Sequence, residues 1–134
     1  MEEKQKEILV VAACQIVYAY PDWDEDYASD VYDMLKVSGT NVTPDIETFF
    51  EMISDAQAEK DSGKTNAEAE KALLEKSEIT MSEAPYYLEL RAPDKTLIYQ
   101  QAINVTIKNG KVKELKYLLD GQSWKGFIDG FLEK

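Results

Sequence analysis

The chain has 134 residues, contains no histidine and one cysteine, and carries a net charge of −11 at neutral pH. This composition excludes Ser-His-Asp and Cys-His catalysis, most catalytic zinc sites and a histidine-based pH switch. The length and the apolar content of 44% are typical of one globular domain with a buried core. Because one cysteine cannot form an intrachain disulfide, nothing requires an oxidising compartment, and the expected location is cytoplasmic.

The first apolar segment contains Val11-Ala12-Ala13-Cys14, which is similar to the lipobox of bacterial lipoproteins. Lipoprotein export through Cys14 is disfavoured because acids outnumber bases before the apolar stretch, where a signal peptide is positive. The stretch is also shorter than the ~20 residues that span a bilayer. We interpret residues 3–20 as a helix that is apolar nearly all round, so it must be covered on every side. A central position in the fold or a second copy of the chain would provide this cover.

Two amphipathic helices are expected after Pro21. The first begins at the acidic residues 22–26, where the helix dipole favours negative charge, and ends at Gly39. The second has Thr43 as its N-cap and Pro44 at its first position. Apolar residues at helical spacing support both, namely Tyr27, Val31, Met34 and Leu35, and then Ile46, Phe49, Phe50 and Ile53. A polar stretch over residues 57–71 leads into a weaker fourth helix, indicated by Ala69, Ala72 and Leu73.

Beyond Pro85 the apolar residues alternate, which predicts an antiparallel meander of three strands. Leu88 and Leu90 mark the core face of the first strand. On the second strand this face contains Leu97, Tyr99, Ile103, Val105 and Ile107. Asn109-Gly110 predicts a type I′ hairpin turn. In the third strand Val112 has the opposite parity to Leu115, Tyr117 and Leu119, so we expect a β-bulge near Lys113 and Glu114.

The last predicted element is an amphipathic helix that begins at Ser123 and packs on the sheet. Its apolar stripe consists of Trp124, Phe127, Ile128, Phe131 and Leu132. The predicted fold class is therefore α+β, with an N-terminal half of three to four helices, a three-stranded antiparallel meander and a C-terminal helix. We divide the chain into an acidic helical half (1–62), a linker with a short helix (63–84) and the meander with its helix (85–134), all within one compact domain.

Charge is distributed unevenly along the chain. Residues 1–60 contain 14 acids and 4 bases, whereas the remainder contains 12 acids and 11 bases. Seven of those bases lie in or near the predicted sheet and its following helix: Arg91, Lys95, Lys108, Lys111, Lys113, Lys116 and Lys125. The acidic half would repel nucleic acid and attract a basic protein surface. The acids expected to contact such a partner are Asp22, Asp24, Glu25, Asp26, Asp30 and Asp33.

Asp22, Asp24 and Asp26 have the spacing of the first three ligands of an EF-hand calcium loop. The rest of that pattern is missing, because Tyr27 stands where the loop needs glycine and Asp33 where it needs a bidentate glutamate. Phosphate and dinucleotide cradles are absent, and no pair of carboxylates is marked as buried. The sequence therefore indicates no catalytic residue, no metal ligand and no cofactor.

Gly126 and Gly130 lie within the predicted last helix, where each costs about 1 kcal/mol relative to alanine. Both fall opposite the apolar stripe. Close approach of a partner's backbone or an irregular end of the chain would each explain them, and we include both among the partner-contact residues. An interfacial membrane helix is disfavoured, because the bases around them only balance the acids.

Residues 8–54 resemble the N-terminal dimerisation domain of the eukaryotic acidic ribosomal stalk proteins. The similarity lies in Ala13-Cys14 within an apolar first helix, an acidic turn, Met34-Leu35-Lys36, Gly39, Asn41-Val42, Pro44 and Phe49-Phe50. This resemblance implies pairing of two chains through their apolar helices. Beyond Asp55 the chain departs from the family, which continues with an Ala/Gly/Pro-rich hinge and an acidic tail that binds translation GTPases. Recruitment of those factors is not implied.

Two functions remain open at this point. The first is a small, acidic, non-enzymatic interaction protein, an adaptor or an inhibitor, that binds a basic protein surface and could self-associate through its first helix. The second is a cystatin-like α+β domain that binds a ligand, or acts as an enzyme, in an apolar pocket under the sheet. That pocket would be lined by Tyr99, Gln101 and Tyr117. Binding through charge should weaken as salt is added, whereas binding in a pocket should not.

Overall fold

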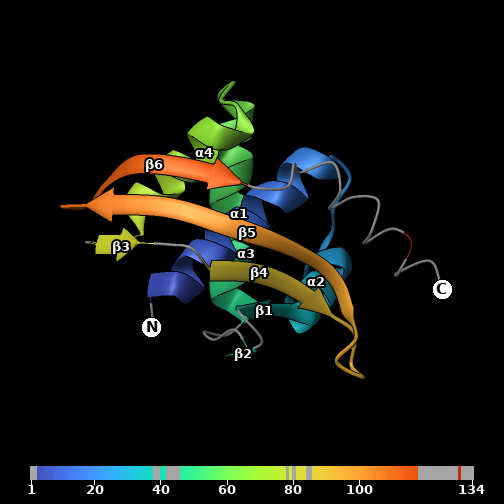
Figure 1. Ribbon diagram of the computed structural model, residues 1–134. Coiled ribbons are helices and arrows are strands. Elements are labelled where there is room, and N and C mark those ends of the chain that lie inside the picture. The colour runs from blue at the N-terminus through green and yellow to red at the C-terminus, as the bar shows by residue number, and fades with distance from the viewer. Residues whose placement is uncertain are drawn as a thin grey trace.

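The computed structural model describes residues 3–37, 40–41, 46–77, 79, 81–83, 86–117 and 130. Helices pack against one face of a curved antiparallel sheet (Figure 1), which confirms the predicted α+β class. The helices are α1 (Glu3–Ala19), α2 (Glu25–Met34), α3 (Ile46–Asp61) and α4 (Asn66–Lys76). The strands are β1 (Leu35–Val37), β2 (Thr40–Asn41), β3 (Met81–Glu83), β4 (Tyr86–Arg91), β5 (Leu97–Lys108) and β6 (Lys111–Tyr117).

Helix α1 is the centre of the fold. Its apolar residues from Ile8 to Val17 are fully buried within a single chain, and the helix packs against α3, α4 and β1. Two side chains of α1 reach opposite ends of α4: Lys6 Nζ donates to the carbonyl of Ser77 at 3.2 Å, and the Tyr18 hydroxyl donates to that of Lys64 at 2.6 Å. The same chain thus supplies the cover that this helix requires. Self-association through α1 stays a prediction that this burial does not support.

The predicted second helix is shorter than expected, and the prediction that it ends at Gly39 is wrong. Helix α2 stops at Met34, and Leu35 begins strand β1. Leu35 pairs with Leu90 of β4 and is buried there. Pairing with the sheet therefore overrides the helical spacing of the apolar residues, which extends to Leu35.

Helix α3 is longer than expected, because it continues to Asp61 through part of the stretch predicted to be a polar turn. Gly63, in the short turn after it, has a φ of 93°, a left-handed conformation that glycine adopts without strain. Thr65 then caps α4 in a capping box: the Glu68 backbone N–H donates to Oγ1 of Thr65 at 3.2 Å, and the Thr65 N–H donates to the Glu68 carboxylate at 3.0 Å. The predicted cap of α3, Thr43-Pro44, lies outside the described residues.

The predicted meander is confirmed as β4, β5 and β6, and the sheet also contains three shorter strands. Strands β3 and β4 pair with one edge of β5, and β6 pairs with the other edge. The β1–β2 hairpin extends the sheet beyond β4. These additional strands have two or three residues each, too few for an alternating pattern to identify them.

Both local predictions for the β5–β6 hairpin are confirmed. Asn109 and Gly110 have φ values of 54° and 75°, as a type I′ turn requires. The β-bulge lies at Lys113, since Thr106 pairs with Glu114 whereas Ile107 pairs with Val112. The bulge corrects the parity of the strand.

The core lies between α1 and the sheet and continues under α3 and α4. Its strand residues are Leu35, Leu88, Leu90, Tyr99, Ile103 and Ile107. Leu97, predicted on the same face, is 42% exposed at the β4–β5 end. The predicted C-terminal helix falls on residues 123–134, of which only Gly130 is described. No helix in the described part of the chain is long and apolar enough to cross a membrane.

The packing of α3 against the core predicts the effect of a large-to-small substitution. Phe49 is fully buried, and its ring centroid lies 5.7 Å from that of Tyr32. Phe49→Ala should lower the free energy of unfolding by about 3 to 5 kcal/mol, because it removes a buried ring and leaves a cavity. Urea unfolding followed by circular dichroism measures this loss. The exposed Leu97 is the control, and Leu97→Ala should cost less than about 1 kcal/mol. Equal losses would contradict the described core.

Candidate protein-interaction surface

The acidic residues after Pro21 organise the start of α2. Asp24 is the N-cap, and its carboxylate accepts a hydrogen bond from the Tyr27 backbone N–H at 2.8 Å. Glu25 and Asp26 follow in the first turn, where the helix dipole stabilises negative charge. Within the described part of the chain, no three Cys, Asp or Glu side chains lie close enough together to hold a metal ion. Asp24 is therefore accounted for by capping.

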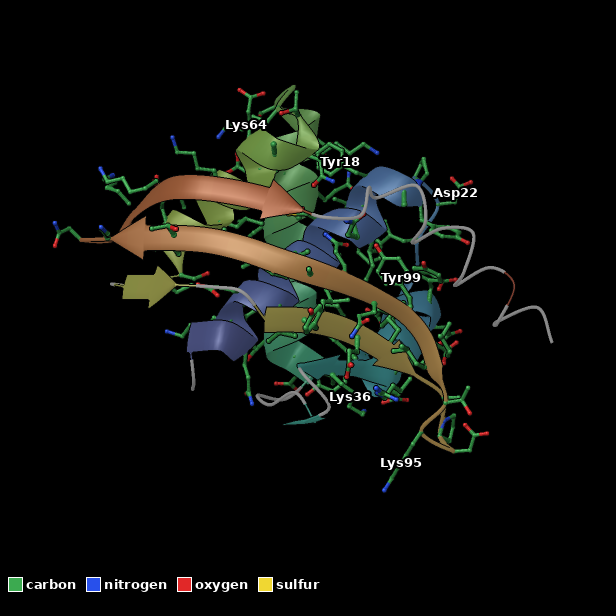
Figure 2. All side chains as sticks on the ribbon, in the orientation of Figure 1. Tyr18, Asp22, Lys36, Lys64, Lys95 and Tyr99 are labelled. Carbon is green, nitrogen blue, oxygen red and sulfur yellow. The ribbon has the colours of Figure 1, made fainter. Side chains whose placement is uncertain are left out.

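All six acids predicted to contact a partner are exposed: Asp22, Asp24, Glu25, Asp26, Asp30 and Asp33. Asp22 is labelled in Figure 2. None of these carboxylates forms an ion pair with another described residue. The nearest candidate, Lys36, donates from Nζ to the backbone carbonyl of Asp33 at 3.3 Å and not to its carboxylate. Within the part of the chain that the structure describes, no base neutralises these negative charges.

Two side-chain contacts place α2 antiparallel to α3. Trp23 Nε1 donates to Oε1 of Gln57 at 3.0 Å, and Tyr32 packs against Phe49 at the other end. On α3, the side chains of Glu47 and Glu51 are exposed. Between residues 22 and 61 the described residues include eleven acids and two bases.

We call these residues the α2–α3 acidic face: Asp22, Asp24, Glu25, Asp26, Asp30, Asp33, Glu47 and Glu51. The sequence analysis did not include Glu47 and Glu51. Their position could have been inferred from the helical spacing of the α3 core residues, which leaves 47 and 51 on the opposite side. What the spacing could not reveal is that α2 lies alongside α3.

Elsewhere, lysine and arginine side chains neutralise part of the acidic charge. Lys64, in the turn before α4, pairs with Glu59 of α3. Lys76 Nζ lies 3.3 Å from Oδ2 of Asp55, and this pair links α4 to α3. Arg91 on β4 pairs with Glu89 at 3.1 Å. The ion pairs among the described residues therefore use acids outside the α2–α3 acidic face.

Five of the seven bases in the predicted basic sheet region fall into two groups, and the side chains of Lys116 and Lys125 lie outside the described residues. Arg91 and Lys95 lie at the start of β5, whereas Lys108, Lys111 and Lys113 lie at or beyond its end. Twelve residues of extended strand separate the two groups, which is a distance of about 36 Å. The β5–β6 turn and α2 lie at opposite ends of the sheet (Figure 1). The lysines of this turn are therefore remote from the α2 carboxylates.

Two of the three residues predicted to line a pocket under the sheet contact each other. Tyr99 and Gln101 are both buried on β5, and the Tyr99 hydroxyl donates to Oε1 of Gln101 at 2.8 Å. Gln101 Nε2 is buried and has no hydrogen-bond partner among the described groups. The paired residues on β4 are the buried Leu88 and Leu90. The side chain of the third predicted residue, Tyr117, lies outside the described residues.

Cys14 and Glu70 form a buried polar site between α1 and α4. Burial, together with the carboxylates of Glu70 and Glu59, raises the pKa of the Cys14 thiol far above its usual range. The thiol is therefore protonated at neutral pH, and it is not an activated nucleophile. Glu70 is fully buried, and neither of its carboxylate oxygens accepts a hydrogen bond from a described group. Burial raises the pKa of Glu70 well above that of an ordinary carboxyl group.

A shallow cavity of about 160 Å³ lies between α3 and α4, and we call it the α3–α4 groove. Val10 of α1 and Leu73 of α4, both buried, form its apolar floor together with Met52. Its polar residues are Thr48, Glu51, Asp55, Lys76 and Ser77. Glu51 belongs both to this groove and to the α2–α3 acidic face, so the two features share one carboxylate.

Of the two glycines proposed to contact a partner, Gly130 is described by the structure and Gly126 is not. Gly130 is exposed, and a Cβ atom added there would meet no other atom within 4 Å. Close packing within the described chain therefore does not require a glycine at this position. Gly126 lies outside the described residues.

Comparison with known proteins identified no matching family, no similar curated protein and no similar solved structure. The resemblance of residues 8–54 to the ribosomal stalk domain therefore stays a prediction.

The buried Glu70 predicts how stability depends on pH. The pKa of Glu70 is raised in the folded state. The contribution of Glu70 to folding stability is therefore fully present below the ordinary carboxyl pKa of about 4.3, and it is lost as the pH rises through the raised value. Glu70→Gln removes the cost of burying a charge, so it should raise the free energy of unfolding at about pH 8 by at least about 1 kcal/mol, with a smaller gain at about pH 5. Chemical denaturation at the two pH values measures both.

Glu47→Gln is the matched control, because Glu47 is exposed on α3. It should leave the difference in stability between the two pH values as it is in the wild type. If Glu70→Gln behaves like this control, or destabilises more strongly at the higher pH, the burial of an unpaired carboxyl group is contradicted.

Proposed function

We propose that this protein is a small acidic interaction module that binds a basic protein surface through its α2–α3 acidic face. The observation that carries the proposal is the lack of ion pairs between the six exposed carboxylates of residues 22–33 and any described base. Charges of one sign that are gathered on one surface produce a potential that accelerates encounter with an oppositely charged partner. They also repel nucleic acid, so the expected partner is a protein.

The way α2 is held also supports binding to a partner. The Trp23–Gln57 hydrogen bond and the Tyr32–Phe49 ring contact fix α2 against α3, and the buried residues Ala28, Val31 and Met34 anchor its apolar side. A surface presented on rigid helices loses little conformational entropy when it binds. The carboxylates are thus displayed on a preorganised support.

A non-enzymatic role agrees with the chemistry of the described residues. The one thiol is buried and protonated, and the buried carboxyl group of Glu70 does not line the α3–α4 groove. An adaptor or an inhibitor needs no activated group of this kind. We therefore favour this role over catalysis.

The second candidate is a cystatin-like domain that binds a ligand under the sheet. The buried contact between Tyr99 and Gln101, with an unpartnered amide nitrogen, is the observation that favours it. A ligand that hydrogen-bonds to this nitrogen would have to enter between packed apolar residues of β4, β5 and α1. Binding of this kind would not depend on salt, which separates it from the first candidate.

The proposed function is tested by comparing two variants with the same net charge. Asp26→Asn with Asp30→Asn removes two charges from the acidic face, whereas Ser62→Lys with Ala67→Lys adds two positive charges at the α3–α4 turn. Affinity capture from a cell lysate at low and moderate salt, with quantitative mass spectrometry, measures what each variant retains. Basic proteins bound by the wild type should be released by salt, lost with the first variant and kept with the second.

Two results would contradict the proposal. Equal loss with both variants would mean that only the total charge matters. Retention that does not depend on salt would favour a ligand or a partner bound in an uncharged site.

A further inference from the structure

The α3–α4 groove has the size of a single side chain. Its volume of about 160 Å³ corresponds to roughly five water molecules at ~30 Å³ each. Pockets for drug-sized ligands or cofactors begin at about 300 Å³. A drug-sized ligand or a cofactor is therefore too large for the groove, whereas one side chain that projects from a partner fits.

The residues that line the groove select the chemistry of that side chain. The floor is apolar, since Val10 is fully buried and only 3% of Leu73 is exposed, and Met52 adds a flexible thioether. Glu51 and Asp55 stand one helical turn apart at the rim of the groove on α3. Carboxylates in this position repel an anion. A neutral aliphatic group would leave these carboxylates without a polar partner. An aliphatic stem that ends in a cation satisfies both the floor and the rim.

Lys76 shows how such a group is held. Its Nζ lies 3.3 Å from Oδ2 of Asp55, and its side chain is 67% exposed. An exposed ion pair of this kind contributes little to stability, so a second cation can displace it. Glu51 forms no ion pair with a described residue and is free to take part.

We propose that the α3–α4 groove is the pocket in which the α2–α3 acidic face receives a lysine or arginine side chain of its basic partner. The aliphatic stem covers Met52 and Leu73, and the cationic group binds Glu51 and Asp55 in competition with Lys76. This inference rests on the proposed function, because it specifies where the basic partner is anchored. It adds a specific contact to an attraction that would otherwise depend on charge alone.

The test is an NMR titration of the full chain with an alanine peptide that contains one central lysine, or arginine in a parallel series. The same peptide with norleucine keeps the stem and removes the charge. The lysine and arginine peptides should shift the methyl signals of Met52 and Leu73 in a saturable way, whereas the norleucine peptide should not. Movement of these methyl signals with all three peptides would overturn the assignment of the rim carboxylates.

Two pairs of variants distinguish binding in the groove from general electrostatic attraction to the acidic protein. Glu51→Gln should weaken binding about fivefold, whereas Asp61→Asn, which removes one negative charge at the C-terminal end of α3 outside the acidic face and the groove, should alter it less than twofold. Lys76→Ala should strengthen binding about fivefold by freeing Asp55, whereas Lys71→Ala changes the net charge equally and should not. Equal effects within either pair would overturn the proposal. All four residues are at the surface, and amide spectra confirm that each variant is folded.

The outcomes for the groove and for the acidic face are distinguishable. Peptide shifts confined to α2, sensitive to salt and absent from the groove methyl groups, overturn the groove and leave the proposed function intact. Failure of Asp26→Asn with Asp30→Asn to reduce capture overturns the proposed function itself, whatever the titration shows.

Discussion

The burial of α1 is the constraint on which the rest of the structure depends. A helix with apolar residues on nearly all sides is stable in water only if other elements surround it. In this chain α3 and α4 pack on it from one side and the sheet closes over it from the other. Lys60 fixes one more contact, because its Nζ donates to the backbone carbonyl of Val17 at 2.9 Å near the end of α1. The arrangement of α3, α4 and the sheet follows from this single requirement.

The same requirement determines where the charges lie. Because α1 takes up the centre, the other helices can bury only one side each, and apart from Glu70 their acids are at least partly exposed. On α4, exposed lysines are available to the acids of α3, as in the Lys76–Asp55 pair. Helix α2 contains no base, so its carboxylates have no such neighbour along the helix. The uneven potential of the molecule is thus a consequence of how its core is built.

Much of this fold follows from local sequence rules. The Asn109-Gly110 turn, the bulge at Lys113 and the start of α2 at its acidic residues each depend on a few neighbouring residues, and the chemistry of those residues is sufficient. The end of α2 is different, because Leu35 has helical spacing in sequence but pairs with Leu90, more than fifty residues away. Long-range pairing of this kind is not encoded in any local pattern.

In the candidate site, too, some features follow from local sequence and others depend on long-range packing. The six acids between residues 22 and 33 could be identified from the sequence, because so many acids occur in so short a stretch. The α3–α4 groove could not, because it depends on Val10, Met52 and Leu73 meeting from three helices. Its volume is set by side-chain packing, for which periodicity gives no information. The absence of histidine narrowed the possible chemistry from the start, but it left the choice between an interaction surface and a pocket to the packing of the chain.

The outer strands of the sheet have a further consequence for how this molecule meets others. Unpaired strand edges invite edge-to-edge aggregation, and proteins prevent it with short strands, bulges and lysines. Here β2 has two residues at one edge, and β6 at the other has its bulge at Lys113 beside the exposed Lys111. Pairing of a strand from another molecule with β2 or β6 at the edges of the sheet is thereby disfavoured. The proposed association would instead use side chains on the helices, where specificity can be encoded residue by residue.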